Sequence, residues 1–326
     1  MGSAVELSTA LGMRRCLAAA VLLGLAALPV RAQVQLVPAD RVAFDTQEWE
    51  GARDRYGRPL VPDALLDRLA YVSLEEAWGS VTSAGYHNKY EGGWAIIHPD
   101  RKMIGRALTA AFLPASPDLE KRMQASATEQ GLRGAMNQFP IYMLARRDVY
   151  VADGFGKIKD GTLIGDNLAQ AIYTNSGNGP VFFGSARDLA GMREIAGFNA
   201  WVKAWHPSYI REMMLASINA PIRIGEAVVL PGDVVLATES GVLFIPPHLV
   251  ERVVRASESV RLTDTFRIQR IREGKYTLAQ TYGTKWTPAI DDDYYAWLQS
   301  DRERLEREIG VPVAVIDDII AKRKRD

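Results

Sequence analysis

Cysteine is almost absent from this sequence, and histidine is scarce. Cys16 is the single cysteine among 326 residues, and it precedes an apolar run typical of a cleavable export signal. Removal of that signal would leave a mature chain with no disulfide, no thiolate nucleophile and no cysteine-ligated metal. The four histidines are scattered, which argues against a histidine-rich zinc site: His87, His98, His206 and His248.

The chain also lacks an excess of either charge. Lysine and arginine together number 39, as do aspartate and glutamate. No global field therefore favours nucleic acid or an anionic membrane, and we expect neither as a partner. The nucleotide-binding and hydrolase patterns GxxxxGKS/T, HExxH and GxSxG are missing, and DGFGKIKDG lacks the third glycine of GxGxxG.

No apolar run is long enough for an ordinary membrane span. The run at 17–28 follows Arg14 and Arg15 and precedes the stretch 30–32, which offers small residues for cleavage. We interpret residues 1–32 as upstream residues followed by a secretory signal peptide, cleaved after Ala32. The mature protein is then expected to be exported, in the periplasm, with no membrane span after cleavage.

The rest of the chain divides into three expected segments. Residues 33–69 form an N-terminal arm and helix, because 33–62 carry prolines, arginines and aspartates without periodicity while 60–81 have helical spacing. The part of the chain that follows alternates between strand and helix patterns and predicts an α/β domain. From Pro247 the chain is helical in pattern and highly charged, so 256–326 are expected to be a helical C-terminal extension.

The middle of the chain has the clearest pattern. Strands are predicted at 104–114, 148–155, 179–184 and 200–205, and helices at 117–130, 166–177 and 189–195. Residues 222–246 are expected to form β-hairpins, with turns at Pro231-Gly232 and Ser240-Gly241. The strand–helix–strand unit at 149–184 is long enough for a parallel crossover, so the loops that leave both strands should meet at one sheet edge.

This edge would bring an arginine and a carboxylate to a helix N-terminus. The amides of Gly165 to Leu168 could bind an anion, and Arg187 could hold a carboxylate with two hydrogen bonds. Asp188 is a hard oxygen ligand suited to Mg²⁺ or Mn²⁺, which could polarise a keto oxygen. These groups suit a 2-oxo acid whose carbon–carbon bond forms or breaks beside the carbonyl.

Each of these residues also has a simpler interpretation. Asp188 and Asp166 both open predicted helices, and helix capping is the commoner role of such an aspartate. Arg187 alone would more often be a surface arginine. His206 follows a predicted strand and could line the same edge, although a packed or surface histidine is the commoner case.

Four phrases in order resemble the RraA-like proteins, a family that includes the 4-hydroxy-4-methyl-2-oxoglutarate/4-carboxy-4-hydroxy-2-oxoadipate aldolases. They are IGRALTAAF, VYVADGFGKIKDGTLIGDNLA, GPVFFGSARD and INAPIRIGEAVVLPGDVVLATESGVLFIP. The resemblance covers about 70–255. It implies a β/β/α swivelling domain, assembled as a homotrimer or homohexamer, with the N- and C-terminal segments as extensions.

The resemblance also implies roles for single residues. Asp188 would bind Mg²⁺ or Mn²⁺, and Arg187 would hold the substrate and steady its enolate. The amides of Gly165, Asp166, Asn167 and Leu168 would take the substrate carboxylate, and Asp166 would contact metal-bound water. Glu258 is a tentative match to an acidic residue that completes the metal site of a neighbouring subunit; the alternative is an exposed helix glutamate.

Two hypotheses follow. The first is a divalent-metal-dependent lyase that cleaves a carbon–carbon bond in a hydroxylated 2-oxo acid and releases pyruvate or a similar 2-oxo acid. It is favoured by the joint presence of the Gly165-Asp166 turn and Arg187-Asp188, which the ribonuclease regulators of the family lack in part. The second is a non-catalytic exported RraA-like binding or scaffold protein.

Overall fold

The fold was analysed in a computed structural model, which describes residues 36–129, 131–282, 285–300 and 302–323. The predicted signal peptide at 1–32 lies outside the described residues. The strands are β1 (Tyr90–Glu91), β2 (Ala95–Ile96), β3 (Met103–Pro114), β4 (Asp148–Asp153), β5 (Pro180–Ala186), β6 (Trp201–Trp205), β7 (Met213–Ile218), β8 (Ile222–Ile224), β9 (Ala227–Val229), β10 (Val234–Thr238) and β11 (Gly241–Ile245).

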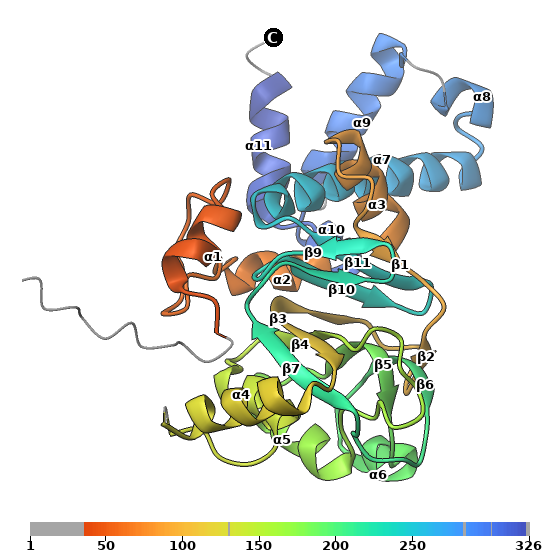
Figure 1. Ribbon diagram of the computed structural model, residues 1–326. Helices are drawn as coiled ribbons and strands as arrows, with labels where there is room; N and C mark the ends of the chain where they lie inside the picture. The colour runs from red at the N-terminus through yellow and green to blue at the C-terminus, as the bar shows by residue number, and fades with distance from the viewer. Residues whose placement is uncertain (1–35, 130, 283–284, 301, 324–326) are drawn as a thin grey trace, which may run out of the picture. The chain divides into compact units, whose positions relative to one another are not determined.

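The helices cover the sheet and form the C-terminal segment (Figure 1). They are α1 (Ala39–Asp45), α2 (Asp63–Leu69), α3 (Leu74–Ser83), α4 (Pro117–Glu129), α5 (Asp166–Ser176), α6 (Leu189–Glu194), α7 (Val250–Arg272), α8 (Leu278–Thr281), α9 (Pro288–Ser300), α10 (Arg302–Ile309) and α11 (Val313–Arg323), with short 3₁₀ segments η1 (Met136–Met143) and η2 (Pro247–Leu249). The predicted mixed α/β fold is confirmed.

One mixed sheet organises the domain. Its strand order is β1-β11-β10-β3-β4-β5-β6-β2, with β7 paired to β3, and the hairpin β8–β9 stands apart from it. The neighbours β3–β4, β4–β5 and β5–β6 are parallel. Helix α5 connects β4 to β5, so the predicted crossover is confirmed. The carboxyl ends of β4 and β5 therefore share one edge of the sheet.

Both faces of the central strands are buried, which explains their nearly continuous apolar runs. Tyr150 and Phe182 pack with residues of α5 and η1 on one face. Val149, Val151 and Val181 pack on the other face with residues of the β8–β9 hairpin. Figure 1 shows α4, α5 and α6 together on the first of these faces. Burial on two sides fixes the register of β4 and β5, and with it the position of the loops that follow them.

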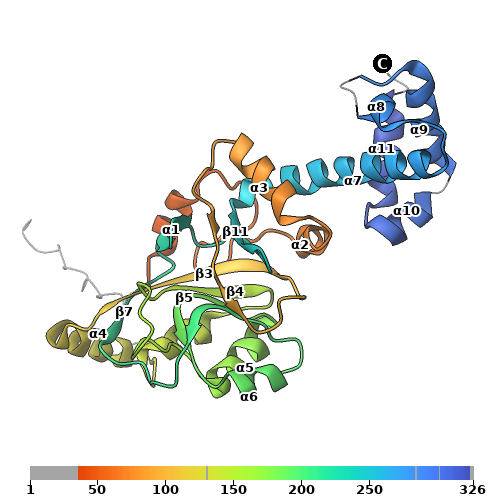
Figure 2. The ribbon, with the colours of Figure 1, turned by 90° about the vertical axis from the view of Figure 1, so that its right-hand side faces the viewer.

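The C-terminal segment is helical, as predicted. The first half of α7 packs with α2, α3 and the strands β10 and β11, through residues such as Val250 and Val254. Its second half supplies Leu262 and Phe266 to a separate core with Trp297 and other residues of α9–α11. Figure 2 shows α8 to α11 gathered around this part of α7. No helix in the described ranges is long and apolar enough to cross a membrane.

The N-terminal arm has regular structure although its sequence shows no periodicity. It contains helix α1, and Arg53 donates to the carbonyls of Thr46, Trp49 and Gly57, which folds the arm back on itself. Arg58 is buried and forms an ion pair with Asp148 at the start of β4, at 2.9 Å. Burial raises the pKa of the Asp148 carboxyl against the opposing effect of Arg58. The buried pair fixes the arm to the sheet.

Two predicted boundaries were wrong in detail. The helix expected across 60–81 is two helices, because Ser73 starts α3 with a capping box in which Glu76 bonds back to the Ser73 amide. The turn at Pro231-Gly232 joins β9 to β10, which pair with different strands, so it does not close a hairpin. The hairpin of β10 and β11 is confirmed, and β8 and β9 form a second hairpin.

Candidate functional site

The loop before α5 runs alongside the end of β5. Leu163 donates its N–H to the Ser185 carbonyl at 3.0 Å, and Arg187 donates its N–H to the Ile164 carbonyl at 3.1 Å. These bonds place Gly165, the N-cap of α5, next to Arg187 and Asp188. The proximity that the crossover predicted is therefore confirmed.

Gly165 makes the close approach possible. A Cβ built on Gly165 would lie 2.4 Å from Asp188 Oδ2 and 3.2 Å from Arg187 Nε. The backbone of Gly165 is extended, with φ of −115° and ψ of −170°, which any residue adopts. Space, rather than backbone conformation, requires glycine here. The helix N-terminus, a carboxylate and a guanidinium share one small volume.

Asp188 occupies the N-cap position of α6 but does not cap the helix. Its backbone is left-handed, with φ of 60°, and its side chain makes no capping hydrogen bond. Asp188 therefore stands at the start of α6, as predicted, but the interpretation of its carboxylate as a helix cap is wrong. Oδ2 lies 3.5 Å from Arg187 Nη1, and both side chains are about one-third exposed, at 35% and 31%. The carboxylate remains accessible to a ligand.

Backbone strain gathers at this sheet edge. Four of the six non-glycine residues with positive φ in the described ranges lie there: Phe155, Asp160, Asp188 and Glu212. Such conformations cost about 1–3 kcal/mol each and are frequent at functional sites. At the end of β4, burial raises the pKa of the Asp153 carboxyl, which accepts the Phe155 N–H at 2.8 Å.

Asp166 is the first residue of α5 rather than its N-cap. Its Oδ1 accepts the N–H of Asn167 at 2.7 Å, so this one amide of the predicted cradle is already engaged. A Cβ on Gly191 in α6 would come within 2.7 Å of Asp166 Oδ2. Asp166 therefore faces the first turn of α6, with its carboxylate held between two helices.

A hollow of about 180 Å³ opens beside these groups. Its lining contains predicted residues and others that sequence reasoning missed: Ala135, Asn137, Gln138, 162–168, Arg187, Tyr209 and Ile210. The guanidinium of Arg187 lies over the Tyr209 ring, 4.6 Å from its centre. Asn137 and Gln138 come from η1, where two amides interrupt an apolar run, the one sequence signal that could have pointed to them.

His206, Glu258 and Asp188 are not among the residues that line this hollow, although Asp188 lies against Gly165, which is. His206 Nδ1 accepts the Ser208 N–H at 3.2 Å, and the His206 N–H donates to the Ala186 carbonyl, so this residue secures the loop after β6. Glu258 is fully buried in α7 and accepts two hydrogen bonds from Arg68, at 2.8 and 2.7 Å. The alternative of an exposed helix glutamate is therefore wrong.

Comparison with known proteins identifies the family. A family model described as "RraA-like: Aldolase/RraA" matches residues 64–244, more than half of the chain. The chain belongs to the RraA-like family. The predicted recognition is thus confirmed, and the matched range includes the α5 turn and Arg187-Asp188.

Individual relatives match parts of this RraA-like chain. Protein DlpA of Legionella pneumophila is 30% identical over 203 residues, which cover 61% of this chain and 30% of DlpA. The 4-hydroxy-4-methyl-2-oxoglutarate aldolase of Thermus thermophilus is 30% identical over 98 residues, 30% of this chain and 58% of that protein. The chain thus aligns with less than two-thirds of either relative.

Solved structures support the same fold. Streptomyces coelicolor RraAS2, described as an unusual member of the RNase ES inhibitor RraA protein family, superposes with a TM-score of 0.55 at 23% identity. The superposition covers 65% of this chain and all of RraAS2. An uncharacterised Pseudomonas syringae protein gives a TM-score of 0.55 at 20% identity, over 69% of this chain and 100% of its own.

The carboxylate oxygens at the sheet edge beside Gly165 fit a hard, hydrated cation. Among the described residues no group of three or more His, Cys, Asp or Glu side chains is placed to hold a metal together. Mg²⁺ and Mn²⁺ do not require such a group, because Mg²⁺ keeps several waters and is commonly bound through one or two carboxylates. Asp188, which is partly exposed and free of a capping bond, provides one.

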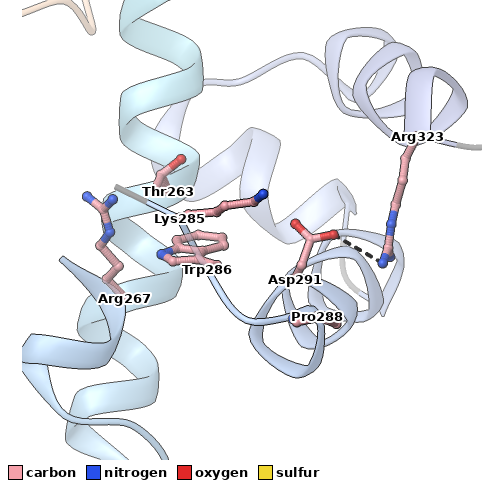
Figure 3. Close-up of a pocket in the computed structure, with 7 residues that line it drawn as sticks. All are labelled: Thr263, Arg267, Lys285, Trp286, Pro288, Asp291 and Arg323. Atoms are coloured by element: carbon pink, nitrogen blue, oxygen red, sulfur yellow. Dashed lines mark ion pairs between the residues drawn. The ribbon is translucent and has the colours of Figure 1, made fainter. Parts of the chain in front are cut away.

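A larger hollow of about 590 Å³ lies among the C-terminal helices, outside the residues that match the RraA-like family (Figure 3). Its charged groups are largely paired with each other or with neighbours: Arg323 with Asp291 at 3.1 Å, and Arg267 with Asp264 at 3.0 Å. The dashed line in Figure 3 marks the first of these pairs. The edge at Gly165 and Asp188 is therefore the stronger candidate site.

Proposed function

We propose that this protein is a divalent-metal-dependent lyase of the class II aldolase or decarboxylase type. It would cleave a carbon–carbon bond in a hydroxylated 2-oxo acid and release pyruvate or a similar 2-oxo acid. The observation that carries the proposal is that the Asp188 carboxylate and the Arg187 guanidinium lie where a side chain at Gly165, the N-cap of α5, would have to be. The aldolase name of the Thermus thermophilus relative supports the reaction class.

The anion-binding groups would orient the substrate. The first N–H groups of a helix have no intrahelical partner and carry a partial positive charge, so the start of α5 suits a carboxylate. Since the Asn167 N–H is bonded to Asp166, the neighbouring amides of Asp166 and Leu168 are the better donors. Arg187, fixed by the Tyr209 ring, would stabilise negative charge as it develops on the substrate.

Asp188 would hold a Mg²⁺ or Mn²⁺ ion, which would supply electrophilic polarisation of the substrate's 2-oxo group. In retro-aldol cleavage, a hydroxyl proton is lost, the adjacent carbon–carbon bond breaks, and the resulting enolate takes up a proton at carbon. Asp166 is the only carboxylate in the described lining of the hollow. We assign to it the uptake and return of that proton.

The test is a coupled assay of pyruvate release by lactate dehydrogenase. The substrates are 4-hydroxy-4-methyl-2-oxoglutarate and oxaloacetate, with and without Mg²⁺ or Mn²⁺, and the spontaneous decay of oxaloacetate is subtracted. Asp188→Asn should abolish metal-dependent turnover. Asp160→Asn is the matched control, because Asp160 has the same left-handed backbone as Asp188 but does not approach Gly165. Equal activity of the two variants would contradict the assignment of Asp188.

A second candidate function is that of a non-catalytic exported binding or scaffold protein. It is suggested by the fold shared with RraAS2, which is described as an unusual member of the RNase ES inhibitor RraA protein family. Thermal unfolding separates the two: a lyase should be stabilised by Mg²⁺ or Mn²⁺ through Asp188, whereas a scaffold should be indifferent to either ion.

Assembly and export complete the proposal. We propose a homotrimer or homohexamer that is exported to the periplasm after removal of residues 1–32. Light scattering during size-exclusion chromatography measures the assembly. N-terminal sequencing of the exported chain should begin at Gln33, and an intact Met1 or Met13 terminus would contradict export by cleavage.

A further inference from the structure

The guanidinium of Arg187 lines the hollow beside α5 with its hydrogen-bond donors unused. Within the described part of the chain, this side chain has one ion pair, with Asp188, and one ring contact, with Tyr209, and it donates no hydrogen bond to the protein. An arginine side chain carries five N–H donors in a fixed planar fork. Arg187 can therefore offer this fork to an anionic ligand.

The ion pair between Arg187 and Asp188 is a long one. Nη1 and Oδ2 are 3.5 Å apart, whereas a charge-assisted hydrogen bond between such groups measures about 2.7–2.9 Å. Arg68 and Glu258 show the close form in the same chain, with two bonds of 2.8 and 2.7 Å. Since opposite charges on adjacent residues attract, another contact must keep the Arg187 guanidinium from closing on Asp188.

The ring of Tyr209 provides that contact. Cζ of Arg187 lies over the ring, 4.6 Å from its centre, which is within the range of about 6 Å for a cation–π interaction. Such a contact attracts the cation through the face of the ring and supplies no oxygen or nitrogen acceptor. The ring can thus orient Arg187 and leave its fork of donors free for a ligand.

The Tyr209 ring is held in place from both sides by the backbone. Asp160 donates its N–H to Ser208 Oγ at 2.7 Å, and the Arg211 N–H donates to the Asp160 carbonyl at 2.8 Å. Tyr209 therefore keeps its position although 59% of its surface is exposed. A group fixed in this way can position a ligand-binding side chain before the ligand arrives.

We propose that Tyr209 is a positioning residue for Arg187. Its ring holds the guanidinium away from the Asp188 carboxylate, so that Arg187 can bind a ligand carboxylate while Asp188 stays open to a cation. This inference rests on the proposed function, in which Asp188 binds Mg²⁺ or Mn²⁺ and Arg187 binds the substrate. Without the ring, Arg187 would be free to close on Asp188, and the closer pair would compete with both ligands.

The first experiment measures Mn²⁺ binding by calorimetry. Tyr209→Leu should weaken it by about three- to fivefold, as expected for a cation–π contact at a partly exposed site, and Tyr209→Phe should retain it because the ring remains. Tyr282→Leu is the matched control, since Tyr282 is an exposed tyrosine beneath Arg267, 5.1 Å from its Cζ, and does not line the hollow. Equal Mn²⁺ affinity of Tyr209→Leu and the wild-type protein would overturn the proposal.

A double-mutant cycle tests whether the effect passes through Arg187. In the background of Arg187→Met, Tyr209→Leu should cause no further change in Mn²⁺ affinity, because no guanidinium remains to close on Asp188. Urea unfolding verifies that each variant is folded. The same three- to fivefold loss in the Arg187→Met background would show that Tyr209 does not act by holding Arg187, and the proposal would be wrong.

Pyruvate binding to the metal-free protein separates failure of this inference from failure of the lyase. In titrations followed by ligand-observed NMR, Tyr209→Leu should bind pyruvate about three- to fivefold more weakly than the wild-type protein, while Tyr209→Phe and Tyr282→Leu should match it. Absence of both Mn²⁺ binding and turnover would refute the lyase, and the pyruvate titration would still decide the role of Tyr209. Equal pyruvate affinities of the wild-type protein and Tyr209→Leu, or no binding to either, would overturn that role.

Discussion

Gly165→Ala gives the sharpest test of the site, because it adds one methyl group at the point where the N-terminus of α5, the Asp188 carboxylate and the Arg187 guanidinium meet. The new Cβ would lie 2.4 Å from Asp188 Oδ2 and 3.3 Å from Arg187 Cζ. The extended backbone at Gly165 accepts alanine without strain. Any effect on activity should therefore come from displaced side chains, since the local fold can be kept.

The expected magnitudes differ sharply for stability and activity. Alanine is a poorer N-cap than glycine, which should lower the free energy of unfolding by roughly 1 kcal/mol. Alanine also makes the unfolded chain less flexible, which should raise the free energy of unfolding by about 0.4–1 kcal/mol. The free energy of unfolding should thus change by less than about 1 kcal/mol. To restore ordinary contact at 3.4 Å from a starting 2.4 Å, the Asp188 carboxylate must move by 3.4 − 2.4 = 1.0 Å. A misplacement of about 1 Å can cost about 100-fold in rate, or about 2.7 kcal/mol of transition-state stabilisation.

The assay combines metal-dependent pyruvate release with urea unfolding of the same preparations. Gly184→Ala is the matched control, because Gly184 lies in β5 near the same edge and a Cβ there would have no neighbour closer than 3.7 Å. The control should keep its activity and its metal dependence. Full activity of Gly165→Ala with an unchanged response to Mg²⁺ would refute the placement of the site at Gly165, Arg187 and Asp188.

Three further substitutions probe the scaffold. Glu258→Gln breaks the buried pair with Arg68 and should lower the free energy of unfolding by about 3 kcal/mol in urea titrations; if its activity per folded molecule also fell, Glu258 would serve a neighbouring site after all. Gly79→Ala should raise stability by about 0.5–1 kcal/mol, because Gly79 lies inside α3 and a Cβ built there has no neighbouring atom within 4 Å; a loss of stability would contradict this placement. Burial lowers the pKa of His248, because the folded protein disfavours the charged imidazolium. The stability that this shift contributes is fully present above pH 6.5 and is lost as the pH falls through the folded pKa. His248→Gln should consequently lose less stability than the wild-type protein between pH 7.5 and pH 5.5, and equal losses would contradict this linkage.

Much of the site could be predicted from local sequence. The apolar runs before Gly154 and Gly184, with a helix pattern between them, required a crossover whose loops emerge at one edge. That argument, without any contact information, brought Gly165 and Arg187-Asp188 together, and the structure confirms it. The helical C-terminal tail was equally predictable from its charge and periodicity.

Other features could not be predicted because they depend on partners distant in sequence. The Asn137 amide reaches Leu163, Tyr209 stacks on Arg187, and no local pattern connects these segments. Likewise Glu258 has the composition of an exposed helix position, yet Arg68, distant in the sequence, buries it as an ion pair.

The sequence by itself determined the crossover, the residues at its edge and their chemical types, because strand and helix periodicity and glycine-marked turns are local properties of the chain. Only the tertiary structure decided the left-handed, uncapped state of Asp188, the contact of Tyr209 with Arg187 and the fold of the N-terminal arm. These depend on which distant backbone and side-chain groups satisfy one another, and long-range packing settles that choice.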